Sequence, residues 1–227
     1  MDSLPPALEN QVTPEAFDAK VPLLIDASTP LLQVGVIEKE GWKSMETSEK
    51  QVMEGLFVAS QKAMAKANLS LSSVDAIFFC EGPGSTLGLR IVCAFIRTIQ
   101  WANHPTPLLM KYNALDLGQT ICKSKTSIQA PFRRGFRLVR TGSQGIGEKK
   151  VFSTEDATQQ FPDSIHFPDP RNPSEEFPKE KIISYDLKEK IKGWIDLLSI
   201  SEICDTATPY NPLPAEFKKW QPPRQEK

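Results

Sequence analysis

Residues 82–85 have the clearest chemical potential in the chain, because the sequence Gly-Pro-Gly-Ser follows the apolar run at residues 74–80 after a single residue, Glu81. Apolar residues at helical spacing come next, so we expect a strand, a tight turn and a helix that begins near Ser85. The first N–H groups of a helix have no partner within it, and together with the helix dipole they favour an anion such as phosphate. The residues expected at this candidate phosphate site are Gly82, Pro83, Gly84, Ser85, Gly88, Arg90 and, at the end of an earlier strand, Asp26.

The glycine turn, residues 82–85, does not specify phosphate binding by itself. No Lys follows the last glycine as in a Walker loop, and the three-glycine spacing of a dinucleotide site is missing. A nucleophile elbow, Gly-x-Ser-x-Gly, is missed by one position. Neither Asp26 nor Ser85 has a His, Lys or metal cluster nearby in the sequence to activate it. A tight structural turn is therefore the favoured interpretation of these residues alone, and the chain is not expected to be an enzyme by itself.

Two ordered motifs resemble the TsaB (YeaZ-type, Gcp-like) subunit of tRNA threonylcarbamoyladenosine synthesis. Residues 82–91, Gly-Pro-Gly-Ser-x-x-Gly-Leu-Arg-Ile, are similar to the signature of that family, and residues 23–29 are similar to its opening strand, which ends in Asp-Thr-Ser-Thr. The resemblance is close over about residues 22–123 and faint beyond. The chain departs from the family pattern at Thr86, Leu87 and Val92.

The resemblance implies an α/β fold of actin-like ATPase (ASKHA, ribonuclease H-like) lobes, each a mixed sheet flanked by helices, with a divergent second lobe. The predicted divisions are a flexible N-terminal arm at 1–20, a first lobe at 21–123 and a smaller second lobe at 124–227 with a proline-rich loop near 161–178. The second lobe keeps the Arg-Arg-Gly of the family's Asp-Ala-Arg-Arg-Gly motif at residues 133–135 but loses its Asp.

Local sequence patterns predict individual strands, helices and helix caps within the two lobes. A third strand is expected near residues 42–45 and a helix over residues 49–67, capped by Ser48 and Gln51 in a capping box. Asn113 is expected to cap a later helix.

The second lobe should contain a hairpin of residues 127–130 with 135–140, followed by a short helix over residues 187–200. The hairpin carries four arginines, Arg133, Arg134, Arg137 and Arg140. A solvated hairpin is favoured over an RNA or partner contact, because alternation along a strand prevents all four from sharing one face.

The function that the resemblance implies is that of a noncatalytic subunit supporting a TsaD-type enzyme in threonylcarbamoyl transfer to an adenosine of tRNA. Two helices of this family pack against the same pair in TsaD, although core packing explains their apolar stripes equally well. The interface residues expected from this resemblance are Val52, Met53, Leu56, Phe57, Met64, Val92, Phe95 and Ile96. Further partners are a TsaE-type ATPase and tRNA through the complex, and a homodimer is expected when the chain is alone.

No cofactor or metal is expected. The four cysteines form no CxxC pair and only two histidines are present, so buried reduced thiols are favoured over zinc or disulfides. The helix over residues 49–67 has no His, whereas TsaD relatives bind metal there through His-x-x-x-His. ATP or ADP binding is expected to be weak at most, at the partner subunit.

The composition of the chain bears on its expected location in the cell and on its expected binding partners. A formal net charge of −1 over 227 residues gives no bulk attraction to nucleic acid or membrane. The start of the sequence lacks the features of a secretory signal and no apolar stretch is long enough to span a bilayer, so we expect a cytoplasmic protein without a membrane contact.

Two alternatives remain open. One is a nucleotide-binding phosphotransferase or ATPase of the same superfamily that uses the glycine turn, although no second phosphate loop is recognisable. The other is a degenerate homodimeric relative that has lost the modification role, which the altered signature positions would fit. Titration with ATP separates the first alternative from the others.

Overall fold

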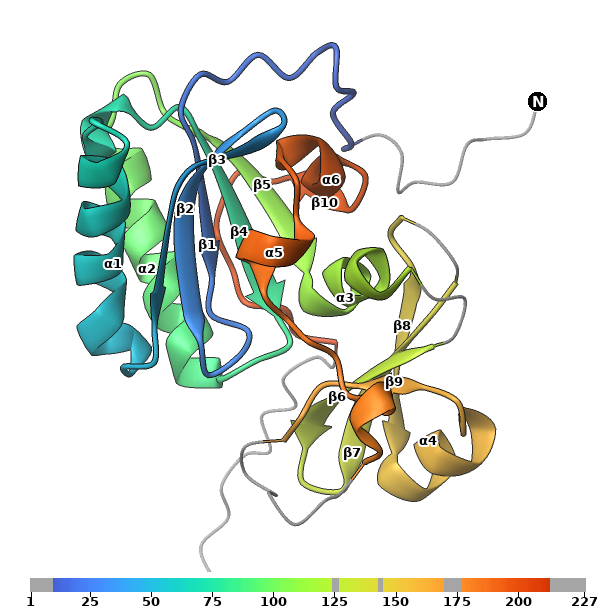
Figure 1. Ribbon diagram of the computed structural model, residues 1–227. Helices are drawn as coiled ribbons and strands as arrows, with labels where there is room; N and C mark the ends of the chain where they lie inside the picture. Colours follow the sequence, from blue (N-terminus) through green and yellow to red (C-terminus); the bar gives the residue numbers. More distant parts are fainter. Residues whose placement is uncertain (1–9, 124–126, 143–144, 170–176, 213–227) are drawn as a thin grey trace, which may run out of the picture.

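The computed structural model describes residues 10–123, 127–142, 145–169 and 177–212, which form two β-sheets with helices packed on them. Figure 1 shows the larger sheet with its helices in the upper part of the molecule and the smaller sheet with α4 below it. Both sheets contain parallel and antiparallel pairs of strands. The predicted α/β class, with mixed sheets flanked by helices, is confirmed.

The first sheet has six strands. Their spatial order is β10 (Ser201–Ile203), β5 (Leu108–Asn113), β4 (Ala76–Gly82), β1 (Pro22–Asp26), β2 (Leu32–Glu38) and β3 (Gly41–Ser48). The central strands β1, β4 and β5 are parallel, and the others are antiparallel to their neighbours. Because β1 and β4 run in the same direction, the loop after Asp26 and the glycine turn after β4 meet at the same end of the sheet.

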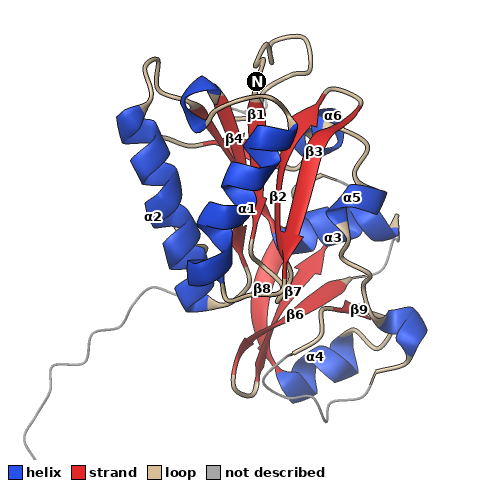
Figure 2. Cartoon of the chain, turned by 60° about the vertical axis from the view of Figure 1, so that its left-hand side comes forward, coloured by secondary structure: helices blue, strands red, loops and turns tan. Residues whose placement is uncertain are grey.

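Helices cover both faces of this sheet. On one face α1 (Val52–Lys66) and α2 (Thr86–Ala102) lie side by side, as Figures 1 and 2 both show. The opposite face carries α3 (Ala114–Cys122), α5 (Leu187–Lys190) and α6 (Trp194–Leu198). A short 3-10 turn, Leu71–Ser73, leads into β4, and a second one, Lys179–Lys181, precedes α5.

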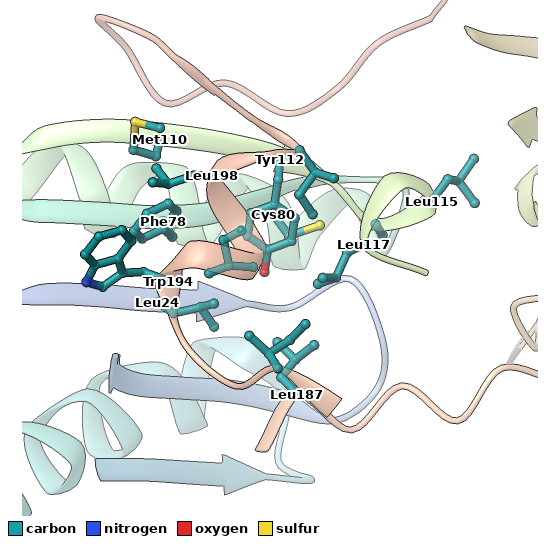
Figure 3. Close-up of a cluster of buried hydrophobic side chains, with 14 of the residues drawn as sticks. Leu24, Phe78, Cys80, Met110, Tyr112, Leu115, Leu117, Leu187, Trp194 and Leu198 are labelled. Carbon is teal, nitrogen blue, oxygen red and sulfur yellow. The ribbon is translucent and has the colours of Figure 1, made fainter. Parts of the chain in front are cut away.

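Alternation along the central strands gives the first sheet two hydrophobic cores. In β4, Ile77 and Phe79 face α1 and α2, whereas Phe78 and Cys80 face the helices on the other side. The second of these cores is drawn in Figure 3, where Phe78 and Trp194 lie beside Leu24. The same core continues into the second sheet through α3, so a continuous core joins the two lobes.

The second sheet has four strands. Their order is β8 (Glu148–Ser153), β7 (Phe136–Thr141), β6 (Ile128–Arg133) and β9 (Ile165–His166), and α4 (Thr154–Gln160) follows β8. The predicted hairpin is present as β6 and β7. The predicted proline-rich loop near 161–178 contains β9, and its residues 170–176 lie outside the described part of the chain.

The predicted capping box at the start of α1 is wrong. Strand β3 extends as far as Ser48, which pairs with Leu32 of β2, and α1 begins only at Val52. The Ser48 hydroxyl accepts a hydrogen bond from the N–H of Lys50, and Gln51 is the N-cap without a side-chain bond. By contrast, the cap predicted at Asn113 is confirmed, because its side chain accepts from the N–H of Leu115 at 3.1 Å.

The helix predicted over residues 187–200 is two short helices, α5 and α6. The chain is extended at Gly193 between them, and there it meets the turn between β2 and β3. A Cβ atom on Gly193 would clash with the Lys39 carbonyl oxygen. This close approach requires glycine and breaks the helix, although the apolar spacing continues across it.

The prediction of a solvated hairpin is wrong for two of its four arginines. Arg137 and Arg140 are buried, whereas Arg133 and Arg134 are exposed at the turn.

The N-terminal segment packs on the first lobe. Phe17 is buried and its ring packs edge-on against Trp194, with a centroid distance of 4.7 Å. Residues 10–20 of the expected N-terminal arm are therefore anchored to the first lobe at Phe17.

Candidate functional site

The glycine turn lies at one wall of a cleft of about 700 Å³. The first lobe contributes the turn, the loop after β1 and the start of α1, and the second lobe contributes residues 130–132 and 167–169. Parallel α/β sheets commonly bind ligands at the carboxyl ends of their strands, where this cleft lies. The cleft is therefore the candidate ligand site of the chain.

Two glycines shape the turn because its backbone geometry requires residues without a side chain. Gly82 has a φ of +128°, which residues with a side chain rarely adopt. A Cβ atom on Gly84 would lie 2.9 Å from both the Cα atom and the carbonyl oxygen of Ser28. The turn therefore packs directly on the loop after β1, as the interpretation of a tight structural turn requires.

Ser85 begins α2 as its N-cap, and its hydroxyl accepts from the N–H of Gly88 at 3.4 Å. Gly88 is buried where the two helices meet, since a Cβ atom there would lie 3.1 Å from a methyl group of Val52. Both residues line the cleft together with Pro83 and Gly84. Arg90 is exposed on α2 and does not line it.

Asp26 is completely buried, and both of its carboxylate oxygens are engaged by protein groups. The N–H and the hydroxyl of Ser28 donate to Oδ1 at 2.8 and 2.6 Å. The hydroxyls of Tyr112 and Tyr185 both donate to Oδ2 at 2.7 Å. The sequence alone gave no signal for these tyrosines, which lie 86 and 159 residues away.

Burial and the negative charge of Asp26 raise the pKa of both tyrosines well above its usual value. The hydroxyls therefore stay protonated and keep donating to the carboxylate. This arrangement makes Asp26 the centre of a structural network that joins β1, β5 and the segment before α5. It leaves little capacity at Asp26 for a metal ion or an activated water.

The cleft carries almost no net charge. Among the described residues that line it, Lys50 is the one cation, and Glu49 and Asp169 are the anions. A polyphosphate is usually held by several cations or by a bound metal ion. Throughout the described ranges, no group of three or more His, Cys, Asp or Glu side chains is arranged to hold a metal. The described lining thus offers a polyphosphate one cationic side chain, Lys50.

The predicted interface residues on α1 and α2 fall into two classes. Leu56, Met64, Val92 and Ile96 are buried against the chain's own first sheet. Val52 and Phe95 are partly buried, whereas Met53 is 70% exposed and Phe57 is 54% exposed. Leu87, which the sequence did not single out as a contact residue, is 65% exposed in the first turn of α2.

These exposed side chains cluster at one end of the helix pair. Met53 and Leu87 both line the rim of the cleft, and Phe57 lies one helical turn beyond Met53. Exposed apolar groups in a contiguous patch are typical of protein contacts. We call Met53, Phe57 and Leu87 the apolar rim.

The described part of the chain contains no helix that is long and apolar enough to cross a membrane. The four cysteines are free thiols; Cys80 and Cys93 are buried, whereas Cys122 and Cys204 are partly buried. Burial raises the pKa of Cys80 and of Cys93, so both stay protonated near neutral pH.

Comparisons with known proteins agree with this fold. The family model of TsaD, the tRNA N6-adenosine threonylcarbamoyltransferase, matches residues 46–109, a stretch that contains α1, β4 and α2. Among solved structures, YeaZ from Pseudomonas aeruginosa is 16% identical with a TM-score of 0.56, and the match covers 84% of this chain and 99% of that one.

A second solved structure, an uncharacterised protein with similarity to peptidase YeaZ from Pseudomonas aeruginosa, is 18% identical with a TM-score of 0.49. That match covers 60% of this chain and 67% of the other. A search of curated proteins gives no match. The chain therefore has a fold like that of YeaZ, with the mixed sheets and flanking helices that the sequence predicted.

Proposed function

We propose that this chain is a noncatalytic TsaB-like subunit that supports a TsaD-type enzyme during threonylcarbamoyl transfer to an adenosine of tRNA. The observation that carries the proposal is the apolar rim, which lies on the two helices matched by the TsaD family model. A partner that covered Met53, Phe57 and Leu87 would remove their apolar surface from water.

The buried residues of the two helices have a different role in this proposal. Leu56, Met64, Val92 and Ile96 hold α1 and α2 on the sheet, so the apolar rim has a rigid support. The partner contact is proposed through the exposed side chains and the partly buried Val52 and Phe95. When the chain is alone, the same surface would be covered in a homodimer.

The engaged state of Asp26 and the nearly neutral cleft support a role without catalysis or a cofactor of its own. The reaction would then take place on the TsaD-type subunit in the cytoplasm, with a TsaE-type ATPase and tRNA reaching this chain through the complex. Any nucleotide would bind at the partner subunit.

The competing function is a nucleotide-binding phosphotransferase or ATPase, because the start of α2 and the glycine turn do line a cleft of sufficient size. Titration with ATP followed by calorimetry separates the two. Binding of ATP by the isolated chain at micromolar concentration, with hydrolysis, would favour the competing function.

Coexpression with the TsaD-type protein from the same source tests the partner role directly. The proposal expects the two chains to elute from size exclusion as one stoichiometric complex. If the chain elutes only as a homodimer in the presence of that protein, the proposal fails and a degenerate relative without the modification role becomes the better account.

A further inference from the structure

The turn between β6 and β7 presents two cations and two aromatic rings at the tip of the second sheet. Arg133 and Arg134 are exposed, and Phe136 is 47% exposed. The guanidinium of Arg133 lies 5.2 Å from the centre of the Phe132 ring. Gly135 turns the chain with a φ of +76°, and a Cβ atom there would meet no atom within 4 Å. We call residues 132–136 the hairpin tip.

The two arginines of the hairpin tip are left available for an external anion. Within the described ranges neither takes part in an ion pair, although the chain has 28 acidic residues. The neighbouring helix α4 is tied to the tip, since the N–H of Thr154 donates to the Gly135 carbonyl at 2.9 Å. Its Asp156 carboxylate accepts from Ser153 in the helix cap rather than pairing with an arginine.

We propose that the hairpin tip binds unpaired nucleotides of an RNA. Guanidinium groups bind phosphate oxygens, and exposed aromatic rings stack on bases that are not paired. The proposal rests on the proposed function, in which tRNA is the substrate of the complex. Phe132 also lines the cleft, so RNA on the tip would run along the opening between the two lobes.

The aromatic rings favour RNA over an acidic protein surface as the ligand. An acidic surface would be recognised by the two cations alone, and it would leave the exposed ring of Phe136 without a matching contact. A nucleotide has both a base with a flat face for the ring and a phosphate for the arginine. The hydrogen bond from Thr154 to Gly135 holds the tip on α4, which reduces the order that has to be gained on binding.

Fluorescence anisotropy with the isolated full chain tests the hairpin tip. The probes are a labelled single-stranded RNA without secondary structure and an unmodified tRNA transcript. The double variant Arg133→Ala/Arg134→Ala should weaken binding to both at least tenfold. It should also reduce the slope of log affinity against log salt by about 1.4, because each phosphate contact on a single strand contributes about 0.7.

A second variant separates stacking from charge. Phe136→Ala should weaken binding about tenfold without changing the salt slope, because base stacking is not ionic. The matched control is Lys188→Ala/Lys190→Ala, which removes two exposed cations from α5. It should leave the affinity within about twofold. Circular dichroism should show the same thermal unfolding for the tip variants and the wild type, since the altered side chains are exposed.

Three results would overturn the proposal. One is no RNA binding by the wild-type chain, and another is an equal loss in the control variant, which would indicate general charge attraction. The third is a tip variant that binds RNA normally but no longer coelutes with the TsaD-type subunit, since the tip would then be a protein contact. Because these RNA measurements use the chain alone, they succeed or fail independently of complex formation through the apolar rim.

Discussion

The Nε atom of Arg140 donates a hydrogen bond to Oδ1 of Asp116 at 2.8 Å, and both side chains are buried. This ion pair joins β7 of the second sheet to α3 on the first. The same carboxylate accepts from the N–H of Gly147 at 2.9 Å and pairs with the Lys149 ammonium at 2.6 Å. The carbonyls of Gly142 and Gly145 accept the remaining guanidinium bonds of Arg140. The two lobes are thus held together by a buried polar network as well as by the shared core.

Replacing Asp116 by Ala should destabilise the fold strongly, because the buried Arg140 and the partly buried Lys149 would lose their counterion. Breaking a buried pair from one side typically costs about 3–5 kcal/mol in the free energy of unfolding. Urea denaturation followed by circular dichroism measures the change. The control is Glu148→Ala, which removes the exposed ion pair with Lys150 and should cost no more than about 1 kcal/mol. Equal effects of the two variants would refute the network's role.

The hydrogen bonds from two tyrosine hydroxyls to Asp26 predict a second effect on the free energy of unfolding. Tyr185→Phe removes one donor to the buried carboxylate, and hydrogen bonds to charged groups contribute about 1.5–3 kcal/mol to the free energy of unfolding. Tyr112→Phe should behave similarly. Thermal and urea unfolding of the two single variants check this prediction, and a Tyr185→Phe variant as stable as the wild type would contradict it.

A structural role for Asp26 also makes a functional prediction. Asp26→Asn should lower the stability of the chain, yet below its unfolding temperature the complex should retain threonylcarbamoyl transfer. The assay is nucleoside analysis of the product tRNA at a temperature where the variant is folded. A variant with wild-type stability and normal complex formation but no activity would instead assign Asp26 a catalytic role.

His166 predicts a pH dependence of stability. Its ring stacks on Phe177 with a centroid distance of 3.9 Å. Burial, followed by the nearby charges of Arg137 and Lys181, lowers its pKa to about 4. In the unfolded chain the pKa returns to about 6.5, so between these values the unfolded state binds more protons. The free energy of unfolding should therefore fall as the pH drops from about 6.5 towards 4.

The slope from this one histidine is at most about 1.4 kcal/mol per pH unit. Urea denaturation at a series of pH values measures it, and His166→Gln is the control because glutamine does not titrate. The difference in unfolding free energy between wild type and variant should change over this window and stay constant above about pH 7. A constant difference throughout would show that the ring is not held neutral by the fold.

The apolar rim predicts a specific effect on complex formation. Phe57→Asp places a charge on an exposed position that the partner would cover, so the fold should be unaffected while the affinity falls about 30-fold, as for a contact of about 2 kcal/mol. Coelution and calorimetry with the TsaD-type subunit measure it. Ile195→Asp, at a partly exposed site on α6 across the sheet, is the control and should bind normally. A folded Phe57→Asp variant with full affinity would exclude the rim as the contact.

Sequence patterns predicted the secondary structure correctly where interactions between neighbouring residues determine it. The continuous apolar run before Gly-Pro-Gly predicted β4 and the turn, and apolar residues at helical spacing predicted α2. The side chain of Asn113 predicted the cap of α3. Ser48 was misassigned because its pairing with Leu32 in the sheet outweighs its tendency to cap a helix. Gly193 broke an apolar pattern because a distant turn at Lys39 packs on it.

The candidate site depends even more on contacts between residues far apart in the sequence, which sequence patterns do not reveal. Arg140 was expected in solvent because its counterion, Asp116, is 24 residues away and on another element. The tyrosines on Asp26 are farther still along the chain, so the sequence could suggest a carboxylate with chemical potential but not that it is already engaged. Which apolar residues of α1 and α2 face the core depends on how the helices rotate on the sheet, and the broad stripe of α1 did not determine that rotation.

The most direct test of the accessory role is the formation of threonylcarbamoyladenosine in tRNA by the TsaD-type subunit with and without this chain. We expect modification to require the chain, or to be strongly stimulated by it, and the apolar-rim variant Phe57→Asp to remove the stimulation. Equal modification with and without the chain, under conditions where both proteins are folded and mixed in excess, would refute the accessory role.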